Sequence, residues 1–440
     1  MSSSTNESRD YDVAVVGGGP AGATTAARLV RKGWRVLVLE RERFPRFHIG
    51  ESQLPWSDEL FQAIGIEPTI AAAGFVQKWG ATFTTADGSR QQYVDFAEGV
   101  ETPRPQTYQV SRAEFDRLLL EHAAGLGATV RQGAQASEVQ FREDGATVRY
   151  TDGDGSHEAK VAAVVDASGR TGFLARKLAG RRYDPLLKNV AVHAWYEGVP
   201  RLTGRRSGDI RMVTRADLGW FWFIPVSETV TSVGIVLPKD VHAAKSTGTP
   251  EENLDRYIHE TPAAAALLAP ARRTSEVRVD ADYSYESERY AGDRWVVVGD
   301  AAAFLDPIFS TGVLLAMQAG IDAADALDRG LKANDLSRKR FAKYERGVRA
   351  RFRYFRRFAA GFYDPPFRDI FYQSEASVGI KRAMISVLAG NWRPSFVTRL
   401  RLLAFFGLVE IQRRTGGIAP PLDPGPEAAP LMRPVEQDGD

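Results

Sequence analysis

The chain has 440 residues, of which 44% are hydrophobic and 25% are charged. This is the composition of a globular protein, and it excludes a collagen-like chain or a coiled coil. There is no cysteine, which excludes disulfides, thiolate metal sites and cysteine nucleophiles. The formal net charge of +2 provides no overall field that would attract nucleic acid.

Neither targeting nor metal-binding patterns are found. The first ten residues are polar and contain no apolar segment of signal-peptide type. The longest uncharged apolar run, at 402–409, is far shorter than the roughly 20 residues of a spanning helix. The six histidines are scattered, without metal-ligand spacing. We therefore expect a cytoplasmic protein with no membrane span and no metal.

The first elements alternate between strand and helix. Residues 11–16 predict a strand, 21–32 a helix and 35–39 a second strand, which is a β-α-β unit with parallel strands. The spacing of apolar residues then predicts a helix at 111–126. Residues 128–150 predict strands, followed by a hairpin turn at 152–155 and a further strand at 159–165.

The second half of the chain changes twice in composition and predicted secondary structure. Residues 181–284 are aromatic and predict many strands, and 294–298 again read as a buried strand, with a helix from about Gly312. After residue 335 the chain is basic and predicts helices. The tail after Gly416 is rich in proline and is expected to be irregular.

A glycine-rich turn joins the first strand to the first helix. In its G-x-G-x-x-G pattern, Gly17 allows the tight turn, Gly19 lets a pyrophosphate approach the backbone, and Gly22 lets helix and strand pack closely. Glu40 ends the next strand, where a carboxylate can accept hydrogen bonds from ribose hydroxyls. A dinucleotide is expected at the helix N-terminus. The turn contributes these candidate residues: Gly17, Gly19, Pro20, Ala21 and Gly22.

These elements predict an α/β fold, α+β overall. A Rossmann-like dinucleotide-binding domain is expected to comprise residues 10–85, 109–180 and 285–335. A strand-rich substrate domain, made of residues 86–108 and 181–284, would interrupt it. Residues 336–440 would form a basic helical region with an irregular tail.

Three motifs indicate which dinucleotide binds. Residues 295–302 read WVVVGDAA, a buried strand that ends in Asp300 at the crevice edge of such sheets. Residues 110–116 contain Val-Ser-Arg, with Arg112, followed by Phe-Asp, and 166–170 read DASGR. Together these motifs resemble the FAD-dependent monooxygenase superfamily. The resemblance implies FAD as cofactor, with Arg112 and Asp300 contacting it.

Three stretches narrow the resemblance. Residues 44–52 (FPRFHIGES), 219–225 (GWFWFIP) and 306–312 (DPIFSTG) are similar to the flavin-dependent halogenases, in particular to those that chlorinate phenols or pyrroles, often tethered to a carrier protein. This implies a two-component enzyme of secondary metabolism, such as antibiotic biosynthesis. It would take reduced FAD from a separate flavin reductase and, with oxygen, place chlorine or bromine on an electron-rich ring. Ser52 is implied to contact FAD.

The same resemblance makes Lys78 the catalytic residue. A lone lysine is usually a solvated charge, but this one lies in a largely uncharged, aromatic stretch, 75–83. Its ammonium could donate hydrogen bonds to hypochlorous acid, or its amine could form a chloramine if burial lowered its pKa. Both possibilities stay open. Trp220 and Trp222 alternate on a strand and share one face, where packing is the common use. In the family such tryptophans screen the flavin from substrate.

Thr311 and Gly312 are the expected chloride site. They open a helix, where unpaired N–H groups suit an anion, although an ordinary helix cap fits the sequence as well. Phe309 stands where tryptophan halogenases carry a glutamate, which argues against a tryptophan substrate.

Two other readings compete with the halogenase. A flavin-dependent hydroxylase, monooxygenase or reductase of the same superfamily would need Gly17, Arg112 and Asp300 but not Lys78. A non-enzymatic flavoprotein would be expected to lack the catalytic residues. A second G-x-G-x-x-G is not found, which fits reduced flavin supplied by a reductase and also fits a single-component hydroxylase.

A basic segment suggests a partner. Residues 338–357 contain ten lysines and arginines and one acid, Glu345, with interleaved aromatic residues. This pattern predicts a helix with one packed face and one basic face. The basic face is either solvated or a docking surface for an acidic carrier protein.

Overall fold

The computed structural model describes residues 9–373 and 378–422, and within them the strands form four sheets. The first is a six-stranded sheet in the order β18-β19-β11-β1-β2-β7, parallel except for β18. Its central strands β1 and β2 are apolar up to the terminal Glu40 of β2, because both faces of the sheet are buried. The strands are β1 (Val13–Val16), β2 (Val36–Glu40), β7 (Thr129–Gln132), β11 (Ala163–Asp166), β18 (Ala291–Gly292) and β19 (Trp295–Val297).

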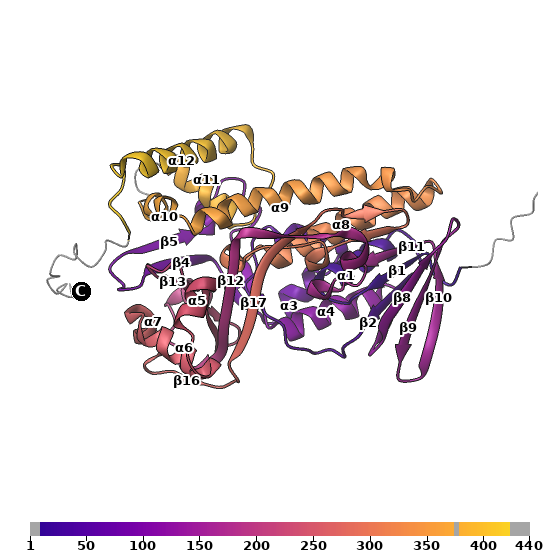
Figure 1. The fold of residues 1–440 in the computed structure, drawn as a ribbon, viewed down its shortest axis with the longest axis horizontal. Coiled ribbons are helices and arrows are strands. Elements are labelled where there is room, and N and C mark those ends of the chain that lie inside the picture. Colours follow the sequence, from indigo (N-terminus) through magenta and orange to yellow (C-terminus); the bar gives the residue numbers. More distant parts are fainter. Residues whose placement is uncertain (1–8, 374–377, 423–440) are drawn as a thin grey trace, which may run out of the picture.

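Helices cover this sheet. The helix after the glycine-rich turn, α1 (Pro20–Val30), packs against both α4 (Arg112–Gly125) and α8 (Gly312–Lys332). Two short helices, α2 (Ser57–Ile64) and α3 (Glu67–Ala72), lie beside them (Figure 1). The expected β-α-β unit, the helix at 111–126 and the helix from Gly312 are confirmed within a residue or two at each end.

A small antiparallel sheet lies at one end of the molecule (Figure 1). It consists of β8 (Gln135–Phe141), β9 (Ala146–Asp152) and β10 (Gly155–Val161). The predicted hairpin turn at 152–155 joins β9 to β10. The predicted strand at 159–165 is wrong as a single element. Its first residues complete β10, and its last ones form β11 in the six-stranded sheet, because Ala162 turns the chain towards Asp12.

The largest sheet has nine strands in the order β20-β17-β12-β15-β14-β13-β4-β5, with β16 pairing β12. Three short helices that the sequence pattern did not predict follow β15: α5 (Lys239–Lys245), α6 (Pro250–His259) and α7 (Pro262–Leu268). A two-stranded sheet, β3 (Val76–Lys78) with β6 (Thr107–Gln109), leads into it. The strands are β4 (Gly80–Thr85), β5 (Gln91–Asp95), β12 (Arg181–Glu197), β13 (Ile210–Thr214), β14 (Trp220–Pro225), β15 (Val230–Pro238), β16 (Arg272–Arg273), β17 (Arg278–Ser287) and β20 (Ala303–Phe304).

The C-terminal region is helical up to Thr415. A long helix, α9 (Ala342–Phe362), runs along the molecule, and α10 (Pro365–Tyr372), α11 (Val378–Leu388) and α12 (Phe396–Thr415) gather at its end (Figure 1). Aromatic side chains on one face of α9 are buried, as the sequence pattern predicted. Most of the tail expected to be irregular, residues 423–440, lies outside the described residues.

Two features bear on the expected organisation. Strand β4 lies within residues 10–85 but pairs in the nine-stranded sheet, next to β13. The division into domains stays a prediction. In the part of the chain that the structure describes, no helix combines the length and apolar character needed to cross a membrane.

Candidate functional site

The glycine-rich turn lies between β1 and α1, and its glycines are required sterically. Gly17 has a φ of +105°, and a Cβ there would overlap the carbonyl oxygen of Ala167. A Cβ on Gly22 would overlap the carbonyl oxygen of Gly17 itself. A Cβ on Gly19 would instead meet only the end of Arg46, at 3.3 Å. The protein therefore needs Gly17 and Gly22 for its own packing, whereas Gly19 keeps space free for something else.

Glu40 closes the turn from the end of β2. Its carboxylate accepts hydrogen bonds from the backbone N–H groups of Gly18, at 2.7 Å, and of Glu42, at 2.9 Å. A carboxylate has about four acceptor positions, so capacity remains for hydroxyl donors from a ligand. The residue lines the cavity described below.

Arg112, the first residue of α4, is held in a buried ion pair. Its Nε and Nη2 donate to the two carboxylate oxygens of Asp116, at 2.8 and 2.9 Å, and Nη1 donates to the carbonyl of Ile49, at 2.6 Å. Burial by itself lowers the pKa of this guanidinium, but Asp116 more than offsets it, and the pKa is raised. Burial, together with the charge of Arg112, lowers the pKa of His48 to about 4, so His48 is neutral at pH 7.

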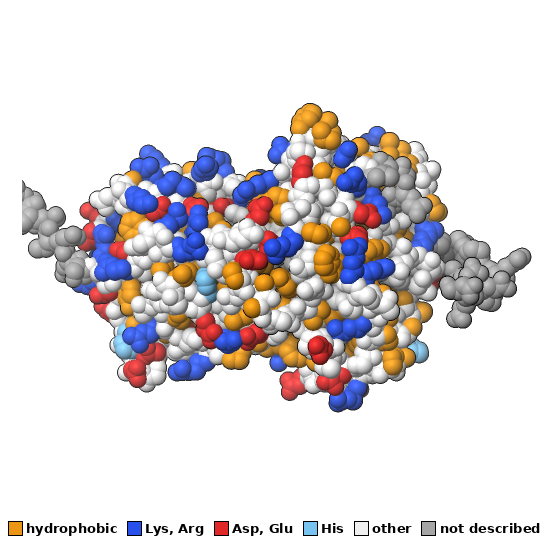
Figure 2. Space-filling view, turned by 180° about the vertical axis from the view of Figure 1, so that it is seen from behind, with side chains coloured by type: hydrophobic (Ala, Val, Ile, Leu, Met, Phe, Trp, Pro, Cys, Tyr) orange, Lys and Arg blue, Asp and Glu red, His pale blue; other side chains and the backbone are white. Residues whose placement is uncertain are grey.

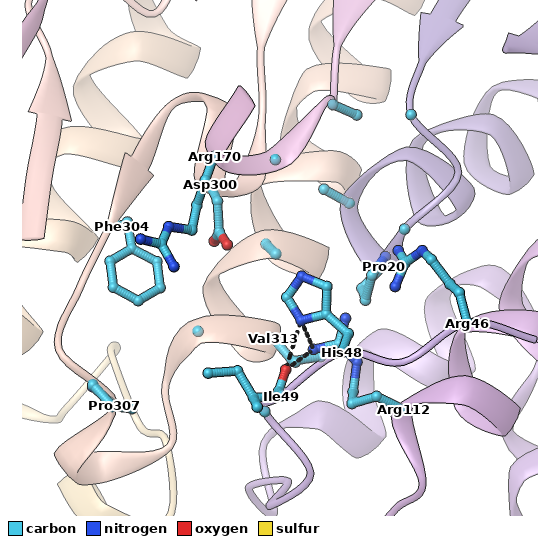
Figure 3. Close-up of a pocket in the computed structure, with 18 of the residues that line it drawn as sticks. Pro20, Arg46, His48, Ile49, Arg112, Arg170, Asp300, Phe304, Pro307 and Val313 are labelled. Atoms are coloured by element: carbon cyan, nitrogen blue, oxygen red, sulfur yellow. Dashed lines mark hydrogen bonds between the residues drawn. The ribbon is translucent and has the colours of Figure 1, made fainter. Parts of the chain in front are cut away.

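Asp300 follows β19 and lies on the opposite side of the same cavity. Figure 3 shows its carboxylate directed into the open space that His48 and Pro20 border from the other side. Within the described residues this carboxylate has no hydrogen-bond partner. Burial raises its pKa to about 6, against the opposing charge of Arg112. An unpaired carboxylate at this position is suited to accept hydrogen bonds from hydroxyl groups of a ligand.

These residues line one cavity of about 440 Å³. That volume is within the range of small-molecule and cofactor sites. The lining of this cavity fits a sugar-phosphate ligand. Gly19 leaves room for a phosphate at the N-terminus of α1, and the carboxylates of Glu40 and Asp300 have free acceptor positions for hydroxyl groups. The predicted site residues in its lining are Gly17, Gly19, Pro20, Ala21, Glu40, Ser52, Arg112, Trp220, Trp222, Asp300 and Gly312. Three others, Gly22, Lys78 and Thr311, lie outside it.

Lys78 ends β3 and lies directly behind the cavity wall. It is 1% exposed, and its Nζ donates to Ser52 Oγ at 2.8 Å and to the carbonyl oxygen of Gln53 at 3.0 Å. Ser52 itself lines the cavity, so one side chain separates the ammonium from it. Burial lowers the pKa of Lys78 to about 7, with the charge of Asp209 opposing. The group therefore changes protonation near neutral pH.

Asp209 fixes the strand that carries Lys78. Its Oδ1 accepts hydrogen bonds from the backbone N–H groups of Trp79, at 2.6 Å, and Gly80, at 2.8 Å, and its Oδ2 accepts from the Tyr93 hydroxyl, at 2.9 Å. The turn before it packs so closely that a Cβ on Gly208 would overlap the backbone of residue 77. Sequence reasoning missed Asp209, because no motif marks it and it lies about 130 residues from its partners.

The two tryptophans are fixed by hydrogen bonds. Both line the cavity from β14, with ring centroids 6.0 Å apart, and both are buried. Trp222 Nε1 donates to Ser232 Oγ at 3.1 Å, and Trp220 Nε1 donates to the hydroxyl of Tyr363 at 2.8 Å. That hydroxyl donates to Asp306 at 2.9 Å. Tyr363, just beyond α9, was also missed, because no motif marks this region.

The start of α8 forms another part of the wall. Gly312 lines the cavity, and Thr311, which precedes it, is buried with its hydroxyl unpartnered among the described residues. The Thr311 carbonyl already accepts a hydrogen bond from Leu315. The first N–H groups of a helix have no partner within that helix, and its positive dipole end lies there. The arrangement can bind a small anion.

Comparison with known proteins agrees with this geometry. Residues 10–353 match the FAD binding domain family. A chlorinase of 1H-pyrrole-2-carbonyl peptidyl-carrier protein from Pseudomonas fluorescens is 36% identical over 77% of this chain and 80% of its own. The corresponding brominase from Pseudoalteromonas luteoviolacea is 34% identical over 75% and 80%.

The fold is also shared with solved structures. The flavin-dependent brominase Bmp2 superimposes with a TM-score of 0.81 and 28% identity, covering 92% of this chain and all of that one. The myxobacterial chondrochloren halogenase CndH is 33% identical, with a TM-score of 0.75 over 90% of this chain and 97% of its own. The cavity and the matched relatives lead to one conclusion: the chain belongs to the flavin-dependent halogenases, enzymes built on the FAD binding domain.

Proposed function

We propose that this enzyme places chlorine or bromine on an electron-rich aromatic ring, a phenol or a pyrrole, with reduced FAD delivered by a separate flavin reductase. The observation that carries this proposal is Lys78, a buried ammonium that contacts only neutral acceptors and lies one side chain behind the cavity wall. A hydroxylase or a reductase of the same superfamily has no need of such a group. We also propose a cytoplasmic location, which the lack of cysteine supports.

The residues around the cavity would hold FAD. The pyrophosphate would bind at Gly19 and the N-terminus of α1, with Pro20, Ala21 and Gly22 shaping the turn. Glu40 and Asp300 would accept hydrogen bonds from ribose and ribityl hydroxyls. Arg112 and Ser52 would border the bound cofactor. When bound, reduced FAD with oxygen supplies the two-electron oxidation of halide to hypohalous acid.

The start of α8 would hold the halide. Among the described residues the buried hydroxyl of Thr311 has no partner, and the N–H groups from Gly312 onward would stabilise negative charge. Lys78 would then receive the hypohalous acid and present its electrophilic halogen to the ring. A pKa near 7 leaves both forms of the side chain available, the ammonium as hydrogen-bond donor and the amine as nucleophile. Trp220 and Trp222 would exclude the aromatic substrate from the cofactor.

The names of the relatives support a tethered substrate. The Pseudomonas and Pseudoalteromonas enzymes act on pyrrole carried by a peptidyl carrier protein. Helix α9 is less suited to dock one than its sequence suggests, because acidic residues elsewhere in the fold pair with four of its seven cations. Arg349 pairs with Glu286 at 3.4 Å, and Arg351 and Arg356 pair with acids from α8 and β12, Asp322 and Asp184.

The test supplies the purified protein with chemically reduced FAD, oxygen, chloride or bromide, and a panel of free and carrier-bound phenols and pyrroles. A product whose mass changes with the halide supports the proposal. Oxygen inserted in place of halogen would identify a hydroxylase instead. Flavin that reoxidises without any modified ring, across the whole panel, would refute aromatic halogenation.

A further inference from the structure

Helix α12 presents an apolar face to solvent. Phe396, Leu400, Leu403 and Ile411 are 75%, 49%, 57% and 50% exposed, and their helical spacing places them on one side. The opposite side, with Leu402, Phe405 and Val409, is buried against α10 and α11. We call the exposed set, with the small residues Ala404 and Gly407 between its members, the α12 stripe. Figure 2 shows hydrophobic side chains gathered on the projecting end of this helix.

The α12 stripe has a composition typical of an interface. Isolated apolar residues on a surface are common, but a row of four along one helix face marks a binding site. Gly407 supports this, because a Cβ there would meet nothing within 4 Å. Glycine inside a helix costs about 1 kcal/mol relative to alanine, and nothing in the chain's own packing requires it there. The small side chains of Ala404 and Gly407 would let a partner approach the backbone of α12.

The charge around the stripe indicates an acidic partner. Residues 391–415 contain five arginines and one acid, Glu410. In the described part of the chain, Arg393, Arg399 and Arg401 have no carboxylate within ion-pair distance. Arg346 and Arg357 of α9 also have none, whereas the other arginines of that helix are paired. A second copy of this chain would bring the same excess of cations against itself, which opposes pairing. A partner with an acidic surface that also carries apolar residues would complement the stripe in charge and in hydrophobicity.

The segment that precedes α12 is linked to the Lys78 region through Trp56. The loop between α11 and α12 contacts Trp56. The backbone N–H of Trp56 donates to the carbonyl of Ala389 at 3.1 Å, and the ring centroids of Trp56 and Trp392 lie 5.0 Å apart. Trp56 is three residues beyond Gln53, whose carbonyl holds Lys78. The side-chain N–H of each tryptophan is buried without a partner in the described residues. A short stretch of chain thus connects the stripe to the Lys78 region.

We infer that the α12 stripe, with Arg393 and Arg399 at its edge, is the docking surface for an acidic carrier protein that bears the aromatic ring as a thioester. This inference rests on the proposed function and adds the place where the carrier binds. The apolar residues would form the centre of the contact, and the arginines would steer the carrier and set its orientation.

The experiment measures binding and catalysis separately. A fluorescent, purified acidic peptidyl carrier protein loaded with pyrrole-2-carboxylate is titrated with the enzyme at two ionic strengths, and halogenation of free and carrier-bound substrate is assayed in parallel. Leu400→Glu and Arg399→Glu are compared with Leu186→Glu and Arg142→Glu, exposed positions outside the C-terminal helices. We expect the α12 variants to weaken carrier binding about tenfold and to raise KM for the carrier-bound ring, with free substrate unaffected.

Several results would overturn the inference. Carrier binding unchanged by both α12 variants, or weakened equally by the control variants, would refute it. It would equally fail if the wild-type enzyme dimerised in solution, or bound anionic phospholipid vesicles, and Leu400→Glu abolished that property but not carrier binding. Because the titration needs no turnover, failure of docking is distinguishable from failure of halogenation.

Discussion

Two buried cations border the same cavity wall and are held in different ways. Arg112 makes two hydrogen bonds to the carboxylate of Asp116, and its pKa is raised. Lys78 contacts a hydroxyl and a carbonyl, both neutral, and burial lowers its pKa to about 7. A buried cation that contacts a carboxylate keeps its proton and serves as a fixed charge. A buried cation with only neutral contacts exchanges its proton near neutral pH, which makes it suitable for chemistry.

The largest expected effect follows from removing the reactive cation. Lys78→Ala should reduce halogenation by about 10²–10⁴-fold, the range for loss of a positioned proton donor. FAD binding should persist, because Lys78 does not line the cavity. Product mass and flavin absorbance after gel filtration measure the two properties. Lys177→Ala, an exposed lysine, is the control. Wild-type rates in Lys78→Ala would refute its assignment.

Cofactor binding can be weakened by a substitution that changes neither Arg112 nor Lys78. Gly19→Val should lower FAD affinity at least about tenfold, because its side chain would occupy the space next to the backbone where we propose that the pyrophosphate binds. The fold should survive, since a Cβ at Gly19 meets only the end of Arg46. Flavin fluorescence titration measures the affinity. Gly125→Val, at a glycine with open space around it, should bind FAD normally, and equal affinity in the two variants would contradict this placement.

The two cations should also differ in what they contribute to stability. In Arg112→Met, the buried Asp116 carboxylate keeps one cationic partner among the described residues, Arg46, whose Nη1 lies 3.2 Å from it. This loss should destabilise the fold by about 3 kcal/mol. Arg112→Met combined with Asp116→Leu should recover most of that loss. Lys78→Met removes a charge that has no carboxylate in contact, so its stability should equal or exceed that of wild type. Thermal unfolding compares the three variants. If Lys78→Met lost more stability than Arg112→Met, the predicted difference between the two cations would be wrong.

The smallest effect concerns Asp209. Its negative charge raises the pKa of Lys78 against burial, so Asp209→Asn should lower that pKa further. Any limb of the pH–activity profile that reports Lys78 should then move to lower pH, and activity at pH 7 should change by less than about tenfold. NMR of ¹³C-labelled lysine, with Lys78→Met to assign the signal, follows the titration without turnover. If the Lys78 titration does not move, Asp209 acts only through the backbone of Trp79 and Gly80.

Sequence alone predicted those parts of the site that lie in continuous segments. The turn at Gly17–Gly22 and the strand before Asp300 each carry a local pattern, because a parallel sheet brings its carboxyl ends to one crevice. The tryptophans at 220 and 222 follow from strand alternation.

The remaining parts depend on contacts between distant segments. Asp209 and Tyr363 act on residues more than 100 positions away, and no local pattern marks such pairs. The same cause explains α9: its sequence shows the arginines, while the acids that pair with several of them come from β12, β17 and α8. The strand expected at 159–165 failed for a related reason, because an apolar run does not reveal that the chain changes sheets at Ala162.

The position of Lys78 has a consequence for the efficiency of the reaction. Gly19 and Asp300 follow strands of the six-stranded sheet, whereas Lys78 is fixed by Asp209, where β4 and β13 of the nine-stranded sheet begin. If the halide is oxidised at the cofactor and passes to Lys78, as proposed, the distance between these two places depends on how firmly the two sheets pack. Moderate heating that loosens this packing would leave the cofactor bound but let the oxidant escape. The yield of halogenated product per oxygen consumed should decline before flavin is released.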